Sequence, residues 1–261
     1  MHAVSPFLLT DRVALVTGAS RGLGYEIAFA MARAGAHVLV NSRSPERTAD
    51  VAARIRAEGY SAEPLPFDVA DRAASSSAFD DIEERFRRLD IFVFNVGMRM
   101  RVPLDRIGTE DFQRMLDVDL TAAYTLTKRA GALMTANGYG RIVFVTSISG
   151  TLANRNDAAY IAAKAGLTGL MRAFAFEYGA SGVTCNAIAP GAFATESNLD
   201  APPERLERVR QRVPIARRGH PPEIGGPAVF LASEEASYVN AHVLTVDGGY
   251  SVALQGERPE G

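Results

Sequence analysis

The chain has 261 residues, of which 47% are hydrophobic and 22% are charged, the balance of a soluble globular protein. A formal net charge of −2 argues against nucleic acid or an anionic membrane as a partner, and no apolar run approaches the roughly 20 residues of a membrane span. The single cysteine, Cys185, rules out an intramolecular disulfide and, with an N-terminus that lacks a signal-peptide pattern, leads us to expect a cytoplasmic protein.

Short apolar runs alternate with longer amphipathic stretches along the chain. Apolar residues at successive positions, as in Ile91–Phe94 and Ile142–Val145, indicate strands covered on both faces, which is typical of a parallel sheet. The alternation predicts a doubly wound α/β fold with a parallel seven-stranded sheet and helices on both faces, as a single domain over residues 1–261. The predicted strands are Val13–Gly18, His37–Ser42, Ala62–Val69, Asp90–Gly97, Arg141–Ser149, Val183–Pro190 and His242–Asp247, and the predicted helices are Leu23–Ala34, Pro45–Glu58, Ala70–Arg88, Thr109–Thr135, Asn156–Gly179 and Pro222–Ser233.

The first predicted strand runs directly into a glycine-rich loop that opens a helix. Glycines at this point permit a tight turn, close approach of the backbone to a pyrophosphate, and tight packing of helix on strand. The start of the helix then offers free N–H groups to phosphates. This predicts a Rossmann-type dinucleotide site, with a merely tight turn as the alternative; its residues are Gly18, Ser20, Arg21, Gly22, Leu23 and Gly24.

The end of the second predicted strand bears on the type of cofactor. A site for NAD usually has an acid here that binds the ribose 2′-hydroxyl, but this chain reads Val40-Asn41-Ser42-Arg43. Arg43 can pair with a 2′-phosphate, and Arg21 offers a second guanidinium, whose rigid fork of donors suits phosphate. We therefore predict NADP in preference to NAD, with Ser42 and Arg43 at the site. The alternative is that both arginines are simply solvated.

Three polar residues with the potential for proton transfer lie at or after the end of the fifth predicted strand. Ser147 lies at its end, Tyr160 follows in the next helix, and Lys164 lies one helical turn after Tyr160 on the same face. An unperturbed tyrosine has a pKa of about 10, so a nearby ammonium and an oxidised nicotinamide would be needed to favour its phenolate. The pattern predicts a proton-transfer site beside a hydride donor. No metal site is predicted.

Residues 192–220 form the one long stretch predicted to be irregular. It is charged and contains Pro202-Pro203. Connections of this length are usually functional, so we expect a substrate lid here.

These motifs resemble those of the short-chain dehydrogenase/reductase family over about Leu9 to Leu254. The resemblance implies that Tyr160 is the general acid/base, that Lys164 binds the nicotinamide ribose and favours the phenolate, and that Ser147 positions the carbonyl. It also implies a homodimer or homotetramer formed through two long helices and the C-terminal strand. The motifs are residues 17–24, Phe67-Asp68-Val69, Asn95-Val96-Gly97, Ser147, Tyr160–Lys164, Asn186-Ala187-Ile188-Ala189-Pro190-Gly191, Thr195 and Val246-Asp247-Gly248-Gly249. The resemblance assigns further cofactor contacts to Asp68, Val69, Asn95, Gly97, Tyr160, Lys164, Pro190, Gly191 and Thr195.

Two positions depart from the family pattern. Val96 replaces an alanine where the cofactor ribose passes. Asp119 stands where the family has a fourth catalytic residue, an asparagine thought to hold a water that links Lys164 to solvent. Asp119 has the same size as asparagine, but an ionised carboxylate only accepts hydrogen bonds. Either Asp119 keeps the role of holding this water, or the site is weakened.

Three functions are compatible with the sequence. Two stretches, Asn41–Arg43 with Arg54–Gly59 and Cys185–Phe193, resemble gluconate 5-dehydrogenases. The alternatives are a 3-oxoacyl-carrier-protein reductase and, in another class, a catalytically weak NADP-binding sensor, for which Asp119 and Val96 are the only support. Arg99 and Arg155 at the expected mouth favour a small sugar acid, because arginine holds a carboxylate by two contacts. A basic rim would also suit an acidic carrier protein. The alternative to substrate recognition is that these arginines are solvated or make subunit contacts.

Overall fold

The predicted strands assemble into one parallel sheet. The computed structural model describes residues 7–253, and its strands lie in the order β3-β2-β1-β4-β5-β6-β7. All residues of β1, β4, β5 and β6 are buried, as expected from their continuous apolar runs. The bounds are β1 Val13–Val16, β2 His37–Val40, β3 Ala62–Pro64, β4 Ile91–Phe94, β5 Gly140–Val145, β6 Val183–Pro190 and β7 Val243–Val246.

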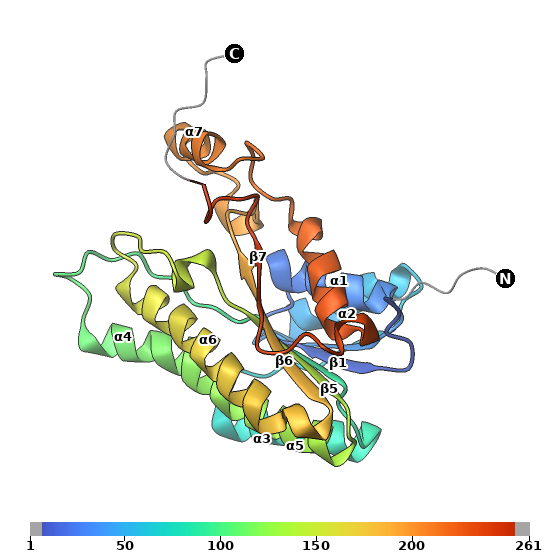
Figure 1. Cartoon of the computed structure of the whole chain (residues 1–261). Helices are drawn as coiled ribbons and strands as arrows, with labels where there is room; N and C mark the ends of the chain where they lie inside the picture. The colour runs from blue at the N-terminus through green and yellow to red at the C-terminus, as the bar shows by residue number, and fades with distance from the viewer. Residues whose placement is uncertain (1–6, 254–261) are drawn as a thin grey trace.

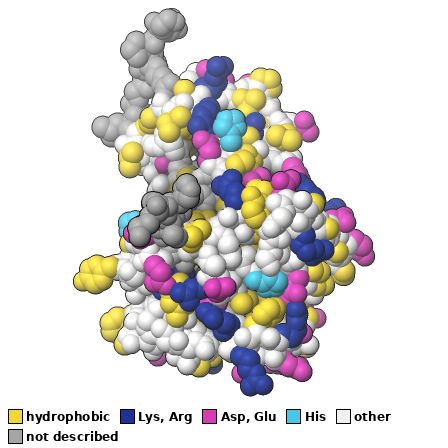
Figure 2. All heavy atoms as spheres, turned by 90° about the vertical axis from the view of Figure 1, so that its right-hand side faces the viewer, with side chains coloured by type: hydrophobic (Ala, Val, Ile, Leu, Met, Phe, Trp, Pro, Cys, Tyr) yellow, Lys and Arg dark blue, Asp and Glu magenta, His cyan; other side chains and the backbone are white. Residues whose placement is uncertain are grey.

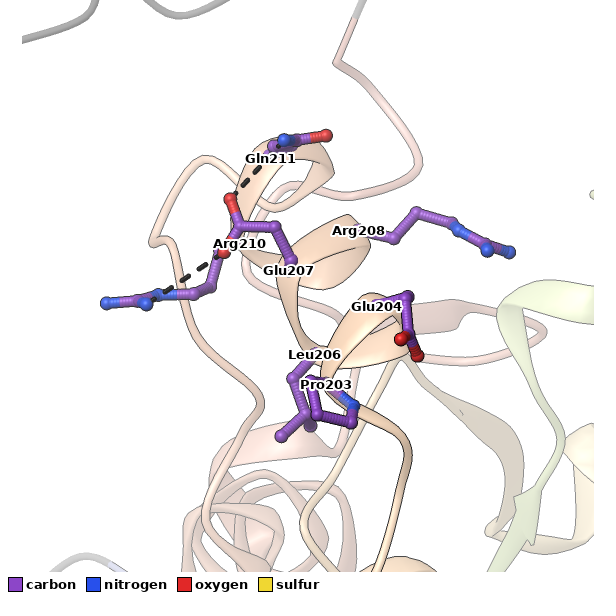
Figure 3. A pocket seen from close by; sticks show the side chains of 7 residues that line it. All are labelled: Pro203, Glu204, Leu206, Glu207, Arg208, Arg210 and Gln211. Atoms are coloured by element: carbon purple, nitrogen blue, oxygen red, sulfur yellow. Dashed lines mark hydrogen bonds and ion pairs between the residues drawn. The ribbon is translucent and has the colours of Figure 1, made fainter.

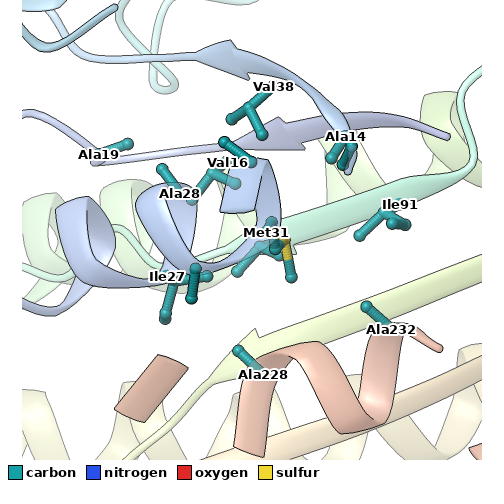
Figure 4. Packing of buried hydrophobic residues seen from close by; sticks show 14 of the residues in the cluster. Ala14, Val16, Ala19, Ile27, Ala28, Met31, Val38, Ile91, Ala228 and Ala232 are labelled. Carbon is teal, nitrogen blue, oxygen red and sulfur yellow. The ribbon is translucent and has the colours of Figure 1, made fainter. Parts of the chain in front are cut away.

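Helices cover the sheet on both faces (Figure 1). On one face α1 (Gly22–Arg33), α2 (Pro45–Ala57) and α8 (Gly225–Ala232) bury Ile27, Met31 and Ala228 against the strands (Figure 4). On the other face α3 (Arg72–Phe86), α5 (Ala122–Ala136) and α6 (Ala158–Tyr178) pack over β4, β5 and β6, and α4 (Thr109–Leu116) lies beside α6. Basic and acidic side chains intermingle on the outer surface that Figure 2 shows.

Most predicted elements are shorter in the structure by a few residues at their ends, and three segments differ further from the sequence prediction. The third strand was predicted to reach Val69 but ends at Pro64, because prolines at 64 and 66 cannot donate to the sheet ladder. The predicted helix Thr109–Thr135 is interrupted by a π-helical turn, Asp117–Thr121, between α4 and α5. The stretch predicted to be irregular contains α7 (Pro203–Arg212), which starts with a proline at a position where no N–H is needed.

The strand order places the predicted site residues at one edge of the sheet. The chain reverses its direction of progress across the sheet between β1 and β4, and ligands of open parallel sheets bind beyond the carboxyl ends of the strands at such a point. The segments that follow β1, β2, β4, β5 and β6 all leave the sheet at this edge. Residues far apart in the sequence therefore meet there. No helix in the described part of the chain is both long enough and apolar enough to cross a membrane.

Candidate active site

A cavity of about 600 Å³ opens at the carboxyl ends of β1, β2 and β4. Most of the predicted cofactor residues line it: Gly18, Ser20, Arg21, Gly22, Leu23, Ser42, Arg43, Asp68, Val69, Asn95, Gly97 and Thr195. A second hollow, shown in Figure 3, is lined by residues of α7 alone and by none of the predicted site residues. The geometry therefore favours the first cavity as the candidate site.

The glycine loop has the backbone shape that its glycines suggested. Gly18 and Gly22 have φ values of +63° and +57°, in the left-handed region where a side chain is strained. A Cβ at Gly24 would lie 2.3 Å from the Gly18 carbonyl oxygen, so only glycine lets the start of α1 pack this closely on the loop. The loop can thus present its backbone to the cavity.

Asn95 ties the end of β4 to the glycine loop. Its Nδ2 donates to the carbonyl oxygens of Thr17 at 3.2 Å and Gly18 at 3.1 Å, and its backbone N–H donates to the Thr17 hydroxyl at 3.1 Å. The neighbouring Val96, larger than the family alanine, packs against Gly18: its Cγ2 would lie 3.2 Å from a Cβ placed there. The described contacts of Asn95 thus hold the loop, and the bulk of Val96 is accommodated by the missing side chain of Gly18.

The end of β2 brings further polar residues to the cavity that sequence reasoning missed. Arg47, in the first turn of α2, lines the cavity with Ser42 and Arg43. Arg47 follows Arg43 by four residues, a spacing that puts two side chains on the same face of a helix. The spacing was not a clear signal here, because α2 begins between the two residues. Asn41 also lines the cavity, and its buried Oδ1 accepts no hydrogen bond in the structure, while its Nδ2 donates to the Leu65 and Phe67 carbonyls. A buried acceptor without a donor is costly and fits a ligand that donates there.

Lys164 and Asp119 form a buried pair beside Gly97. The Lys164 side chain is almost completely buried, and its Nζ donates to the carbonyl oxygens of Val145 at 3.3 Å and Val96 at 3.4 Å. Nζ also lies 3.6 Å from Asp119 Oδ2. A Cβ at Gly97 would approach Nζ to 2.9 Å, so glycine leaves room for the ammonium. Three segments of chain therefore hold the charge of Lys164 in place.

Asp119 lies in the π-helical turn, a feature that often marks functional positions in helices. It is fully buried, its Oδ1 accepts from the Met98 N–H at 2.7 Å, and its Oδ2 accepts no hydrogen bond. Burial raises the pKa of Asp119 above the ordinary carboxyl value, although Lys164 and the Met98 N–H act in the opposite direction. The ion pair is therefore balanced against a substantial cost of desolvation.

Tyr160 and Ser147 lie on either side of the loop that follows β5. Tyr160 is in the first turn of α6, and Lys164 Nζ lies 5.7 Å from the centroid of its ring. Ser147 precedes a short 3₁₀ turn, Ile148–Gly150, and its Oγ accepts from the Ser149 N–H at 3.1 Å. Because that bond uses the oxygen as an acceptor, the hydroxyl proton of Ser147 remains available to a substrate oxygen.

The remaining predicted residues differ in their surroundings. Arg99 lines the cavity, but its guanidinium binds the carboxylate of Asp157. Arg155 is exposed and has no ion pair or hydrogen bond with another described residue. Pro190 is buried at the end of β6, and Gly191 follows it. A Cβ at Gly191 would lie 2.6 Å from the Asp247 Cβ, so this glycine is needed for the close packing of the two chain segments. Among residues 7–253, no group of three or more His, Cys, Asp or Glu side chains is arranged to hold a metal ion.

Comparison with known proteins extends over nearly the whole chain. Residues 18–251 match a family described as enoyl-(acyl carrier protein) reductase. The chain is 39% identical to a 3-oxoacyl-[acyl-carrier-protein] reductase from Synechocystis, over 92% of this chain and 97% of that protein. It is 36% identical to a gluconate 5-dehydrogenase from Gluconobacter oxydans, over 95% and 98% respectively. The crystal structure of a gluconate 5-dehydrogenase from Burkholderia cenocepacia, in complex with NADP and tartrate, is similar with a TM-score of 0.93 and 35% identity, covering 97% of this chain and 100% of that one.

The replacement Asp119→Asn tests the balance of forces on this residue. The pKa of the Asp119 carboxyl is higher in the folded protein than its ordinary value of 3.8, so the folded state holds this proton more tightly than the unfolded state. The wild type therefore loses stability as the pH rises from 3.8 through the raised pKa of the folded state. The amide oxygen of asparagine still accepts from the Met98 N–H, and because the amide does not titrate, the variant does not lose this stability as the pH rises. We expect the melting temperature of the variant, relative to that of the wild type, to increase between pH 4 and pH 8. Asp117→Asn, at an exposed position nearby, is the baseline; a difference that shrinks with pH would mean that the attraction to Lys164 exceeds the cost of burial.

Proposed function

The chain belongs to the short-chain dehydrogenase/reductase family, and on that premise we propose that it is an NADP-dependent oxidoreductase that moves a hydride between nicotinamide and a carbonyl or secondary alcohol. The observation that carries the proposal is the arrangement of Tyr160 with the buried ammonium of Lys164, 5.7 Å from its ring, beside a cavity lined by the glycine loop. A lysine with a purely structural role could be buried and ion-paired without a tyrosine and a glycine-lined cavity beside it.

The lining of the cavity supports NADP as the cofactor. Arg21, Arg43 and Arg47 line it, and none of the residues 41–44 directly after β2 is acidic. Guanidinium groups bind phosphate with several charge-assisted hydrogen bonds, which would favour a 2′-phosphate. The unpartnered Oδ1 of Asn41 is an acceptor for a ligand N–H or O–H. The similar Burkholderia enzyme was crystallised with NADP.

The proposed mechanism gives proton transfer to Tyr160 and orientation to Ser147 and Lys164. A nicotinamide bound in the cavity would supply or accept the hydride. In reduction, the Tyr160 phenol donates its proton to the carbonyl oxygen, and in oxidation the phenolate takes the alcohol proton. Ser147 would donate a hydrogen bond to the same oxygen, keeping its own proton, and so orient the substrate. Lys164 donates to two backbone carbonyls and lies 3.6 Å from Asp119 Oδ2, and its ammonium would also bind a ribose hydroxyl of the cofactor.

A sugar acid is the substrate class that we propose. Arg155 is exposed in the segment between Ser147 and Tyr160 and has no partner among the described residues, so its guanidinium is free to bind a carboxylate. The Gluconobacter relative is named for a sugar acid, and the Burkholderia structure holds tartrate, a hydroxy acid. A second candidate, a 3-oxoacyl-carrier-protein reductase, is favoured by the Synechocystis relative. The sensor with weak catalysis is disfavoured because the chain has Ser147, Tyr160 and Lys164 together.

Two features outside the cavity complete the proposal. Residues 192–220, which contain α7, would act as a lid over the substrate, because they follow β6 at the edge where the cavity opens. The two long helices α5 and α6 carry exposed aromatic side chains, with Phe176 91% and Tyr124 47% accessible. We take these exposed rings as part of the contact surface of the proposed homodimer or homotetramer.

Replacing Arg43 by alanine tests the choice of cofactor. Loss of a charge-assisted phosphate contact costs about 1.5–3 kcal/mol, roughly ten- to a hundredfold in affinity. We expect Arg43→Ala to weaken NADPH binding by that factor and to leave NADH binding nearly unchanged, measured by nicotinamide fluorescence. Arg54→Ala is the control, because Arg54 is on α2 but outside the cavity, where it bonds to Tyr25. An equal loss for both nucleotides would contradict recognition of the 2′-phosphate.

Replacing Tyr160 by phenylalanine tests the acid–base role. The substitution removes the proton donor and keeps the ring, so turnover should fall by about 10²–10⁴-fold with NADPH binding nearly intact. Tyr178→Phe makes the same change in the same helix and should keep its activity. If Tyr160→Phe retains most of its turnover, another group carries the proton.

Replacing Arg155 by alanine tests the substrate class. A lost carboxylate contact is worth about 1.5–3 kcal/mol, so we expect KM for an acidic substrate such as a keto-gluconate to rise roughly ten- to a hundredfold. KM for the neutral keto-sugar analogue should change little, because that compound offers no carboxylate. Steady-state assays with both compounds decide the matter, and an equal change in the two KM values would remove the case for carboxylate recognition at Arg155.

A further inference from the structure

Arg99 is stacked on the ring of Tyr160. It lies in the loop after β4, and its guanidinium carbon is 4.6 Å from the centroid of the tyrosine ring. A guanidinium over an aromatic face is attracted by the ring electrons and also fills space that the ring would otherwise sweep. The sequence suggested that Arg99 binds a substrate carboxylate, but this contact directs it to the tyrosine instead.

The same guanidinium is held by Asp157. Arg99 Nε donates to Asp157 Oδ1 at 3.2 Å, and its Nη2 donates to Oδ2, so the contact is a two-point fork. The Asp157 side chain is fully buried, and it caps no backbone N–H although it directly precedes α6. A buried carboxylate needs a counter-charge, and Arg99 supplies it more closely than Arg101, whose Nε is 3.6 Å away.

The pair joins the two segments that flank the tyrosine. Asp157 is three residues before Tyr160, and Arg99 is two residues after Gly97, whose small size accommodates Lys164. A backbone bond from the Val102 N–H to the Asn156 carbonyl, at 3.1 Å, fastens the same two loops together. The contacts with Asp157 therefore fix the position of the Arg99 guanidinium that lies against the ring.

We propose that Arg99 and Asp157 form a positioning clamp that fixes the ring of Tyr160 for proton transfer, and that Arg99 is not a ligand of the substrate carboxylate. The inference rests on the proposed acid–base role of Tyr160. Arg99 has two nitrogens and most of its charge committed to Asp157, which leaves little for an anionic substrate. A misplacement of about 1 Å at a reacting group can cost on the order of a hundredfold in rate, so a residue that restricts the ring acts on kcat.

The test compares turnover and substrate affinity in variants of the full-length protein. Arg99→Met removes the fork and the charge and keeps much of the side-chain length. We expect kcat to fall about ten- to a hundredfold for both a keto-gluconate and its neutral keto-sugar analogue, with both KM values and NADPH affinity changed less than about threefold. Asp157→Asn should lower kcat in the same way, and the double variant should be no slower than the slower single variant, because both residues act through one contact.

Two further variants separate positioning from general damage. Arg99→Lys keeps a cation near the ring and Asp157 but lacks the fork, so it should recover part of the lost kcat; it also keeps a counter-charge for Asp157 if Arg99→Met folds poorly. Arg106→Met removes an exposed arginine from the same loop and should behave as wild type. A rise in KM for the acidic substrate alone, with kcat unchanged, would overturn the proposal and make Arg99 a substrate ligand.

The outcomes also distinguish this inference from the proposed function. Full turnover of Arg99→Met together with inactivity of Tyr160→Phe would overturn the clamp and leave the acid–base role in place. Full turnover of Tyr160→Phe would overturn both.

Discussion

The ammonium group of Lys164 is buried where four segments of chain meet, and the rest of the site is arranged around that charge. A buried cation must be compensated, and here the compensation comes from the carbonyls of Val96 and Val145 and from the carboxylate of Asp119. The carbonyls belong to the segment after β4 and to the end of β5, the carboxylate to the π-helical turn, and the lysine to α6. Satisfying this one charge therefore sets the mutual positions of the strands and helices that carry Tyr160 and Ser147.

Charges alternate through the site around the tyrosine. Asp119 lies beside Lys164, and Asp157 beside Arg99; each cation in turn lies near the ring of Tyr160. Both carboxylates are buried, so neither is screened by water, and each is costly without its partner. The arrangement keeps two cations close to a phenol while the local net charge stays near zero. A substitution at either carboxylate would consequently be felt at the tyrosine without touching it.

The side of the cavity where we propose that the cofactor binds depends on backbone shape more than on side-chain charge. Gly18 and Gly24 bring the loop and the start of α1 together, and Asn95 secures that loop from β4. Charge enters at the end of β2, where Arg43 and Arg47 stand on either side of the start of α2. The division is physical: a pyrophosphate is met by backbone N–H groups, whereas the distinction between a 2′-phosphate and a 2′-hydroxyl requires side chains.

Short-range features of this protein could be predicted from the sequence alone. The glycine loop, the parallel sheet and the one-turn spacing of Tyr160 and Lys164 follow from backbone sterics and from helix and strand periodicity, which neighbouring residues determine. The ion pair of Arg99 with Asp157 joins residues 58 apart, and Asp119 meets Lys164 across 45 positions. No local pattern encodes such contacts, because they exist only when segments far apart in the sequence reach the same edge of the sheet. The π-helical turn could not be predicted either, because one extra residue in a turn changes the helical periodicity too little to be recognised in the sequence, and its buried Asp119 meets Lys164 only in the tertiary structure.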